Sequence, residues 1–370
     1  MKRFFRTILL ILNAVALLLM LGSTMAGVVP PSKFIGFSLL SYGYLYFLLL
    51  NVVFIIIWLM LSSKWFLLSL AGILLRMSFI PLFFQVGGTD KVDDDDGQPM
   101  LKVMSFNAHG FRGSEMGDFT VKDSNMLEFI QILEEEQPDV LVLQEYVNRG
   151  DTVILSDRLG RMGYRHKISA EGRPFSGEII FSKLPTVYAD GWCDVDKFYA
   201  DMLWNDDTVR IYCLHLDSYH LDQSDHKQIH DISHGNVDST MGRSTFRKFR
   251  ETILTHEQEW ETIQPFFESR DRMTVVAGDF NDMPASYLYQ QFRKLFVDSY
   301  CEAGLGFSTT YHGDFRTLAA FTAFRIDMVL HTPDLQAIAY KRIKSDISDH
   351  YPILVTLVKH GSALRPAERN

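Results

Sequence analysis

Between Met1 and Gly88 the chain contains no aspartate and no glutamate. Its charged residues there are all basic and number six: Lys2, Arg3, Arg6, Lys33, Lys64 and Arg76. The whole chain has a formal net charge of -9, so the residues after Gly88 carry -15. This sharp change in charge predicts two parts in different surroundings, a basic apolar region at residues 1–88 and an acidic soluble part after it.

Cysteines and basic clusters are also scarce. The chain has 3 cysteines, Cys193, Cys213 and Cys301, and their spacing indicates neither a zinc motif nor a disulfide framework. Of the 36 lysines and arginines, 6 precede Gly88, so the soluble part sets 30 basic residues against 45 acidic ones. Since proteins bind nucleic acid mainly through lysine and arginine on phosphates, this balance weakens a nuclease function without excluding it.

Long apolar runs, in contrast, fill the first region. These runs contain one charged residue, Arg76, and extend from Thr7 to Leu21, from Phe34 to Leu61 and from Trp65 to Val86. Each run is close to or above the roughly 18–20 residues that cross a bilayer as a helix. We therefore expect two or three transmembrane helices, the lower number applying if the first run is a cleaved signal peptide.

The basic residues also predict an orientation. With Lys2, Arg3 and Arg6 inside, the chain leaves the membrane on the outer side after Val86, whether or not the first run is cleaved. Lys64 then falls inside, as the positive-inside rule prefers. In a bacterium this corresponds to the inner membrane, with the soluble part on the periplasmic or extracellular side.

The soluble part begins after a Gly- and Asp-rich stretch, and we expect an acidic linker at 89–100, a domain at 101–359 and a tail at 360–370. Apolar runs and helical periodicity alternate through the domain. Strands are expected at 101–106, 140–143, 164–168, 178–181, 209–214, 274–277, 326–330 and 353–358, and helices at 125–137, 155–162, 243–269 and 286–294. This alternation predicts an α/β fold with a site built on loops at one edge of a sheet.

Polar residues follow or precede these strands in five short segments. They are Asn107, Gln144-Glu145, His215-Leu216, Gly278-Asp279-Phe280-Asn281 and Ser348-Asp349-His350, with Arg325-Ile326-Asp327 between the last two. Glu145 offers the oxygen ligand that Mg²⁺ prefers. Asp279 can orient or deprotonate a water, Asn281 can donate to a phosphoryl oxygen, and His350 beside Asp349 is a pairing used in acid–base chemistry. Each residue alone is more often a turn, cap or loop residue, so the weight lies in the set.

Taken in this order, the segments resemble the endonuclease/exonuclease/phosphatase superfamily, which includes pancreatic-type deoxyribonucleases and neutral sphingomyelinases. The resemblance covers about residues 100–359. Its matching segments are Val103 to Asn107, Pro138 to Glu145, Ile179 to Pro185, Cys213 to Leu216, Val276 to Asn281, Thr310-Tyr311 with Arg325 to Asp327, and Ser348 to Ile353. It implies a four-layer α/β/β/α sandwich with two packed central sheets.

The resemblance also implies roles. Glu145 would be the principal ligand of a divalent metal, Mg²⁺ or alternatively Mn²⁺, with Asn107 beside it and Asp349 supporting it or binding a second ion. Asp279 would orient the attacking water, with Asn281 on the phosphoryl group. His350, held by Asp327, and His215 would face the phosphate. These roles agree with a reaction in which water attacks an anion, because catalysis then depends on charge neutralisation and positioning.

Three features leave alternatives open. Glu178 stands where relatives usually place an apolar residue, which indicates either a local difference in the site or an edge position. The segment Asp217 to Gly242 carries His226, His230 and His234, and we favour a solvated insertion over a second metal site.

The substrate is expected to be a phosphoester, most simply a phosphodiester, from a lipid headgroup, a small molecule or nucleic acid. A nuclease and a non-catalytic membrane-anchored binding protein are the alternatives, and no protein partner is expected.

Overall fold

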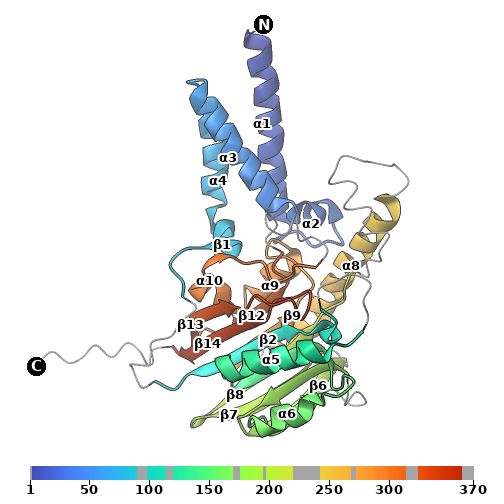
Figure 1. Cartoon of the computed structure of the whole chain (residues 1–370). Coiled ribbons are helices and arrows are strands. Elements are labelled where there is room, and N and C mark those ends of the chain that lie inside the picture. Colours follow the sequence, from blue (N-terminus) through green and yellow to red (C-terminus); the bar gives the residue numbers. More distant parts are fainter. Residues whose placement is uncertain are drawn as a thin grey trace, which may run out of the picture.

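A bundle of helices stands on an α/β domain in the computed structural model, which describes residues 2–89, 98–113, 120–169, 176–194, 197–219, 242–267, 272–313 and 324–360 (Figure 1). The first sheet has the strand order β10-β12-β9-β8-β7-β6 and the second the order β13-β14-β2-β3-β5-β4. The strands of the first sheet are β10 (Val297–Asp298), β12 (Asp327–His331), β9 (Met273–Asp279), β8 (Asp207–His215), β7 (Lys197–Trp204) and β6 (Thr186–Asp194). Those of the second are β13 (Leu335–Arg342), β14 (Ile353–Lys359), β2 (Leu101–Asn107), β3 (Val140–Val147), β5 (Ser176–Ser182) and β4 (His166–Ser169).

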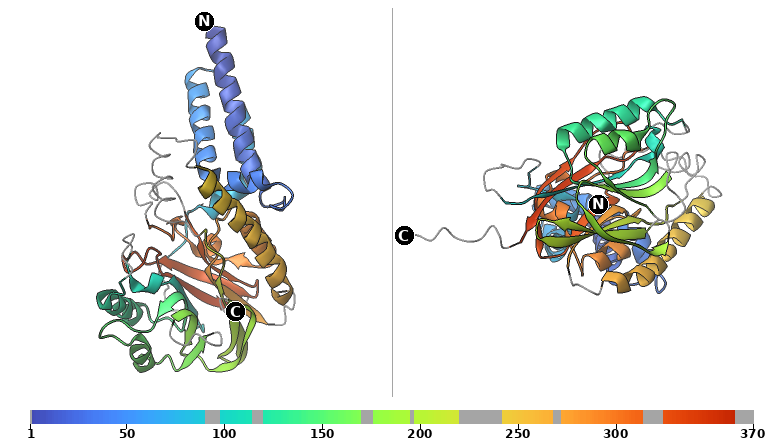
Figure 2. Two further views of the ribbon diagram at one scale, coloured as in Figure 1. Left: turned by 90° about the vertical axis from the view of Figure 1, so that its right-hand side faces the viewer. Right: turned by 90° about the horizontal axis from the view of Figure 1, so that it is seen from below.

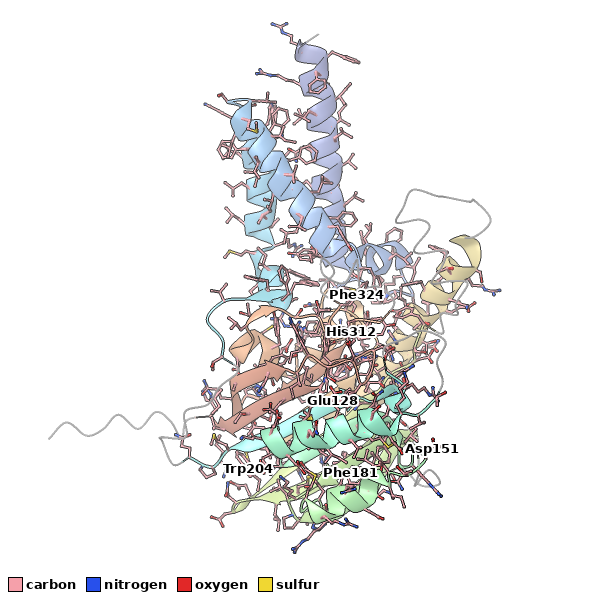
Figure 3. The ribbon with its side chains drawn as sticks, viewed as in Figure 1. Glu128, Asp151, Phe181, Trp204, His312 and Phe324 are labelled. Atoms are coloured by element: carbon pink, nitrogen blue, oxygen red, sulfur yellow. The ribbon has the colours of Figure 1, made fainter. Side chains whose placement is uncertain are left out.

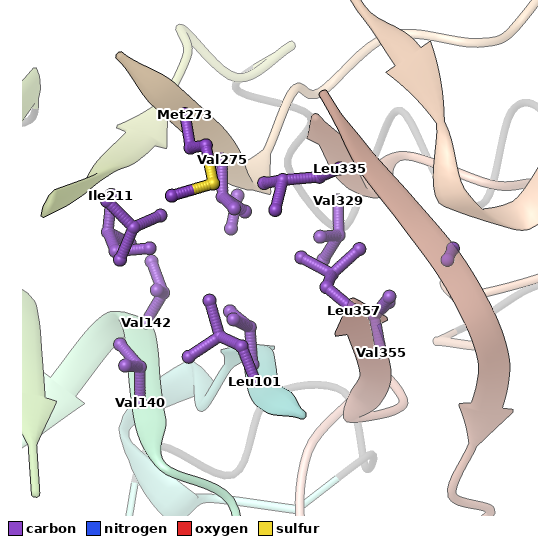
Figure 4. Packing of buried hydrophobic residues seen from close by; sticks show 14 of the residues in the cluster. Leu101, Val140, Val142, Ile211, Met273, Val275, Val329, Leu335, Val355 and Leu357 are labelled. Carbon is purple, nitrogen blue, oxygen red and sulfur yellow. The ribbon is translucent and has the colours of Figure 1, made fainter. Parts of the chain in front are cut away.

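The two sheets pack face to face. Side chains such as Val142, Ile211, Val275 and Val355 fill the space between them and are fully buried (Figure 4). They alternate along their strands with residues that face the outer layers, as the period of two in a β-strand requires. This buried cluster holds the strand ends of both sheets in fixed relative positions.

Helices cover the outer face of each sheet (Figure 2, right). On the second sheet these are α5 (Asp123–Glu136) and α6 (Leu155–Arg161), which bury an apolar cluster that includes Phe106 and Phe129. On the first they are α8 (Gly242–Ile263), η4 (Gln264–Phe267) and α9 (Tyr287–Phe292), while α10 (Ser299–Ala303) packs Tyr300 and Ala303 into the cluster between the sheets. The expected four-layer α/β/β/α sandwich is therefore confirmed.

The N-terminal region forms four helices, α1 (Lys2–Met25), α2 (Ile35–Ser41), α3 (Tyr44–Met60) and α4 (Phe66–Leu75). Among the described residues, α1 is the one helix long and apolar enough to cross a membrane by itself, and α2 with α3 would make a second span bent by 69°. Large apolar side chains are exposed along α1, α3 and α4. An exposed apolar surface of this extent is typical of contact with lipid or with another protein.

The third apolar run does not form the single long helix that we expected. Helix α4 ends at Leu75, Arg76 departs from helical geometry, and the chain continues as the 3₁₀-helix η1 (Met77–Leu82), which contains Pro81. Proline cannot donate a backbone hydrogen bond and clashes with the preceding turn, so it stops an α-helix. Helix α4 has 10 residues and is about 15 Å long, too short to cross a bilayer unaided.

The start of the expected linker is tied to the domain by backbone hydrogen bonds. The short strand β1 (Phe84–Gln85) pairs with β11 (Gly306–Phe307), and Thr89 exchanges backbone hydrogen bonds with Ala303 and Tyr340 of the domain. A side chain at Gly88 would collide with the carbonyl oxygen of Gly304, at 1.9 Å. The acidic part of the linker, residues 90–97, lies outside the described residues.

The helices and the domain also share one apolar cluster. Met20, Tyr44 and Phe83 pack in it together with Tyr289 and Phe292 of α9. The fully buried guanidinium of Arg325 pairs with Asp298 at 2.7 Å, stacks near the ring of Tyr300, and donates to the carbonyl of Leu82. The N-terminal region is therefore packed against the domain along a broad interface.

Candidate active site

Two pairs of parallel strands bring the polar residues together. Strands β2 and β3 run parallel, and so do β8 and β9, so that each pair ends at the same edge of its sheet. In the first sheet His215 lies opposite Asp279, and Asp279 lies opposite Asp327, which places three predicted residues in one row across neighbouring strands. Asn107 and Glu145 stand at the corresponding edge of the second sheet.

Unusual backbone geometry marks this edge. Glu145, Asn281 and His109 have positive φ angles of 47°, 48° and 43°. The pairing of β3 with β5 shifts register between Leu143 and Tyr146, so Glu145 lies in a bulge that turns its side chain out of the strand pattern. At Gly278, φ is 154° and a Cβ atom would meet the carbonyl oxygen of Leu214 at 1.8 Å, so no other residue fits. Non-glycine residues with positive φ are rare, and their clustering here is typical of a functional site.

Asn107 connects the two sheets at this edge. Its amide nitrogen donates to Glu145 Oε1 at 3.1 Å and to Asp279 Oδ2 at 3.0 Å. The other carboxylate oxygen of Asp279 accepts from the backbone N–H of Asn281 at 2.8 Å. Asp279 is buried, and burial together with the neighbouring Asp327 charge raises its pKa to about 6, against the lowering effect of His350 and His215. A carboxylate with such a pKa can accept a proton from water near neutral pH.

His350 lies beside Asp279 and is held from behind. Its Nδ1 contacts the Asp327 carboxylate at 2.9 and 3.1 Å, while Nε2 lies 3.8 Å from Asp279 Oδ2. Burial alone would lower the pKa of His350, but the charges of Asp327 and Asp279 raise it well above its ordinary value. The imidazole is therefore charged at neutral pH. Asp327 itself is fixed by the Thr310 hydroxyl, which accepts from the backbone N–H groups of Ile326 and Asp327.

His215 has a partner that the sequence did not identify. Its Nδ1 lies 2.8 Å from Glu178 Oε1, and Glu178 is 7% exposed. Burial alone would lower the pKa of His215, but the hydrogen bond to Glu178 and the charges of Asp279, Glu178 and Glu145 raise it to about 9. Glu178 thus lies at the site, and the signal that pointed to it was a carboxylate in an otherwise apolar strand.

Two carboxylates at the mouth of the site form the candidate metal centre. Glu145 and Asp349 both face His109 Nδ1, at 3.5 and 3.7 Å. Burial alone would raise the pKa of Glu145, but contacts with His109, His215 and Asn107 lower it to about 2, so this carboxylate is ionised at neutral pH. The two carboxylates supply oxygen donors that fit a hard divalent cation such as Mg²⁺, while the Asn107 amide donates to Glu145 and its oxygen accepts from the backbone N–H of His109. His109, two residues after Asn107, was not singled out in the sequence.

A second group of donors lies deeper. One ligand atom from each of Asp279, Asp327 and His350 falls within 4.8 Å of the others, close enough for an ion. These three residues already contact one another, whereas the side chains of Glu145 and Asp349 are 38% and 17% exposed. The structure thus offers a reachable position at Glu145 and Asp349 and a buried one behind it.

Asn281 and Asp282 complete the turn after β9. The Asn281 side-chain amide donates to the carbonyl of Leu216 at 2.8 Å, which engages one of its two N–H groups. Asp282 does not cap the following helix, because Ser286 caps α9 by accepting from Tyr289 N. The Asp282 carboxylate instead contacts Tyr42 and His256. Of the histidine-rich segment, the residues from His220 to Met241 lie outside those described.

Comparisons with known proteins agree with this fold. A family model described as "Endonuclease/Exonuclease/phosphatase family" matches residues 104–350, and a second, described as a domain of unknown function, matches residues 6–83. No curated protein matches the chain. Among solved structures, an endonuclease/exonuclease/phosphatase from Beutenbergia cavernae DSM 12333 is 19% identical, over 71% of this chain and 72% of that chain, with a TM-score of 0.49.

Two further structures are similar at the same level. The mannosyl-6-phosphatase of Bacteroides thetaiotaomicron VPI-5482 is 18% identical over 70% of this chain and 99% of that chain, with a TM-score of 0.46. D. rerio TDP2, complexed with a single strand DNA product, is 17% identical over 70% of this chain and 98% of that chain, also with a TM-score of 0.46.

Proposed function

The chain belongs to the endonuclease/exonuclease/phosphatase family, whose members hydrolyse phosphoesters, and on that premise we propose that it is a divalent-metal-dependent hydrolase of phosphodiester bonds, held at a membrane by its N-terminal helices. The observation that carries this proposal is the row His215, Asp279 and Asp327 on neighbouring strands, with His350 beside it and Glu145 joined to it through Asn107.

The residues of this row have complementary protonation states near neutral pH. Asp279, with a pKa of about 6, is mostly ionised and can orient a water and accept its proton. His350 and His215 are positively charged and both lie near Asp279, so they can neutralise the oxygens of a phosphoryl group as charge builds up in the transition state. Glu178 and Asp327 hold the two rings in place.

Glu145 and Asp349, with Asn107, would hold the metal ion. When bound there, a divalent cation would polarise the phosphoryl oxygens and stabilise the leaving group. Two carboxylates at this position would repel a negatively charged phosphoester, so a cation is needed between them and the substrate. We assign Mg²⁺ to this position on donor chemistry, with Mn²⁺ as the alternative.

The membrane part of the proposal is supported by how basic residues are distributed along the helices. Figure 1 shows the N-terminus and the connection between α3 and α4 at the end of the helices away from the sheets. Lys2, Arg3, Arg6 and Lys64 belong to these two segments. Because cytoplasmic ends carry an excess of lysine and arginine, we propose that residues 1–88 are the membrane region and that residues 101–359 form the catalytic domain on the opposite, outer side.

The test is a substrate screen with the full chain in detergent. We expect hydrolysis of bis-p-nitrophenyl phosphate that depends on added Mg²⁺ or Mn²⁺ and stops in excess chelator. Activity that persists in the chelator would refute the metal dependence. DNA, RNA, phospholipids and sugar phosphates assayed beside it would then identify the class of phosphoester, and an enzyme that cleaves only DNA or RNA would replace this proposal by a nuclease.

A further inference from the structure

Four polar side chains meet where the N-terminal helices rest on the domain. They are Tyr42, from the connection between α2 and α3, Tyr219, which follows β8, His256 of α8, and Asp282, and we refer to them as the Tyr42 cluster. His256 and Asp282 are 1% and 4% exposed, so the cluster is inside the protein. None of the four belongs to the proposed catalytic set.

The hydrogen bonds of the cluster have a definite direction. The Tyr42 hydroxyl donates to Asp282 Oδ1 at 2.8 Å. A hydroxyl has one hydrogen, so Tyr219 donates to Tyr42 in turn. His256 lies 3.3 Å from Asp282 Oδ2 through Nδ1 and 2.8 Å from the Asp217 carbonyl through Nε2. Both of these partners are acceptors, so both ring nitrogens donate.

The cluster joins, by hydrogen bonds, the two chain segments that follow His215 and Asp279 of the proposed active site. Asp282 follows Asn281 directly and Asp279 by three residues, while Asp217 and Tyr219 follow His215 by two and four. His256 bridges the two segments, and Tyr42 reaches them from the N-terminal region. In Figure 3, His312, whose backbone N–H donates to the carbonyl of Asp349, lies closer to the N-terminal helices than Phe181 and Trp204 do.

We propose that Tyr42 is a positioning residue for the proposed hydrolysis: by holding Asp282, it fixes the turn that carries Asp279 and Asn281. On this view the N-terminal helices are a working part of the enzyme as well as an anchor. The turn contains Asn281 at positive φ, a strained conformation that persists only where the surroundings impose it. Without the Tyr42 hydroxyl, Asp282 Oδ1 keeps the N–H of Met283 as its described partner, and the turn loses its hydrogen bond to the N-terminal region.

The first test compares Tyr42→Phe with Tyr46→Phe in the full chain in detergent. Phenylalanine keeps the ring contact with Phe249 and removes only the hydroxyl. Since a displacement of about 1 Å at a reacting group costs up to roughly a hundredfold in rate, we expect kcat to fall about 10- to 100-fold with little change in KM. Tyr46 is an exposed residue of α3, and its variant should behave as the wild type. A Tyr42→Phe enzyme with wild-type kcat would overturn the proposal.

A double-mutant cycle separates positioning from general destabilisation. If Tyr42 acts through Asp282, then Tyr42→Phe added to Asp282→Ala should lower kcat no further, because alanine leaves the Tyr42 hydroxyl without its acceptor. If the two losses multiply instead, the proposed route through Asp282 is wrong.

Hydrogen exchange gives a readout that does not depend on any substrate. Tyr42→Phe should speed amide exchange in peptides that contain Leu216 to Tyr219 and Gly278 to Met283, and leave β14 unchanged. Unaltered exchange at both segments would overturn the proposal. If the wild type hydrolyses none of the esters, the proposed function fails, and the exchange result still decides whether Tyr42 fixes the turn.

Discussion

The pair formed by Glu178 and His215 gives a prediction whose size follows from the structure. The change is Glu178→Gln, which keeps the shape of the side chain and an oxygen that can accept from His215 Nδ1 but removes the negative charge. Because the His215 pKa lies above its ordinary value, at about 9, the ring is charged at neutral pH and loses that charge as the pH rises through about 9. Without the carboxylate we expect the charge to be lost at lower pH.

The magnitude follows from the strength of one charged hydrogen bond. Such a bond contributes about 1.5–3 kcal/mol, and one pKa unit corresponds to about 1.4 kcal/mol, so the variant's His215 pKa should fall to between about 7 and 8. At pH 8.5 the charged fraction then drops from roughly three quarters to between about 3 and 25%. The rate at pH 8.5 should therefore fall roughly 3- to 25-fold relative to the wild type, and the rate at pH 6 should change little.

The assay is kcat/KM for bis-p-nitrophenyl phosphate from pH 5.5 to 9.5 at saturating Mg²⁺. In the wild type it should rise as Asp279 ionises, near pH 6, and fall near pH 9, and the variant should move only the second limb. Glu302→Gln is the matched control. Glu302 Oε2 lies 3.1 Å from Nε2 of the buried His331, and this pair is outside the proposed site. An unchanged alkaline limb in Glu178→Gln, or an equal shift in Glu302→Gln, would show that a charged His215 is not needed.

Three further predictions concern other parts of the molecule. Asp327→Asn removes the anion that holds His350 and should lower kcat by about 10²- to 10⁴-fold in initial-rate assays, so a loss below tenfold would contradict its role. Glu145→Gln should weaken Mn²⁺ binding by at least about tenfold in calorimetric titrations, and an unchanged affinity would move the metal elsewhere. Asp298→Ala leaves Arg325 buried without its carboxylate and should cost about 3–5 kcal/mol, measured as a lower Tm of the full chain; an unaltered Tm would mean that this pair does not stabilise the fold.

Strand ends were the most predictable part of the structure. Six strands have long apolar runs beside polar residues, namely β2, β3, β8, β9, β12 and β14. All six were expected within a few residues of their observed bounds. Strands β6, β7 and β13 were not expected. In β7 the apolar pattern is interrupted by Lys197 and Asp201, which are buried because they pair with Glu259 and with Arg210 and Arg272. A charge that is satisfied by a distant residue looks like a solvated one in the sequence.

The same limit applies to the site. Asn107, Glu145 and Asp279 each end or follow a predicted strand and His350 precedes one, and the structure brings them together. The partners that tune them, Glu178 and His109, lie in a strand and a turn whose neighbours are set only by tertiary packing. Likewise, nothing local to Asp282 indicates that a tyrosine 240 positions earlier donates to it.

We propose that this site hydrolyses a phosphoester with water. The most direct test is the hydrolysis of bis-p-nitrophenyl phosphate by the full chain in H₂¹⁸O with Mg²⁺, with wild type and Asp279→Asn side by side. We predict that the wild-type product carries one ¹⁸O on phosphorus and that the Asp279→Asn rate falls by about 10²-fold or more. A product without the label, or equal rates for the two proteins, would contradict an attack by water assisted by Asp279.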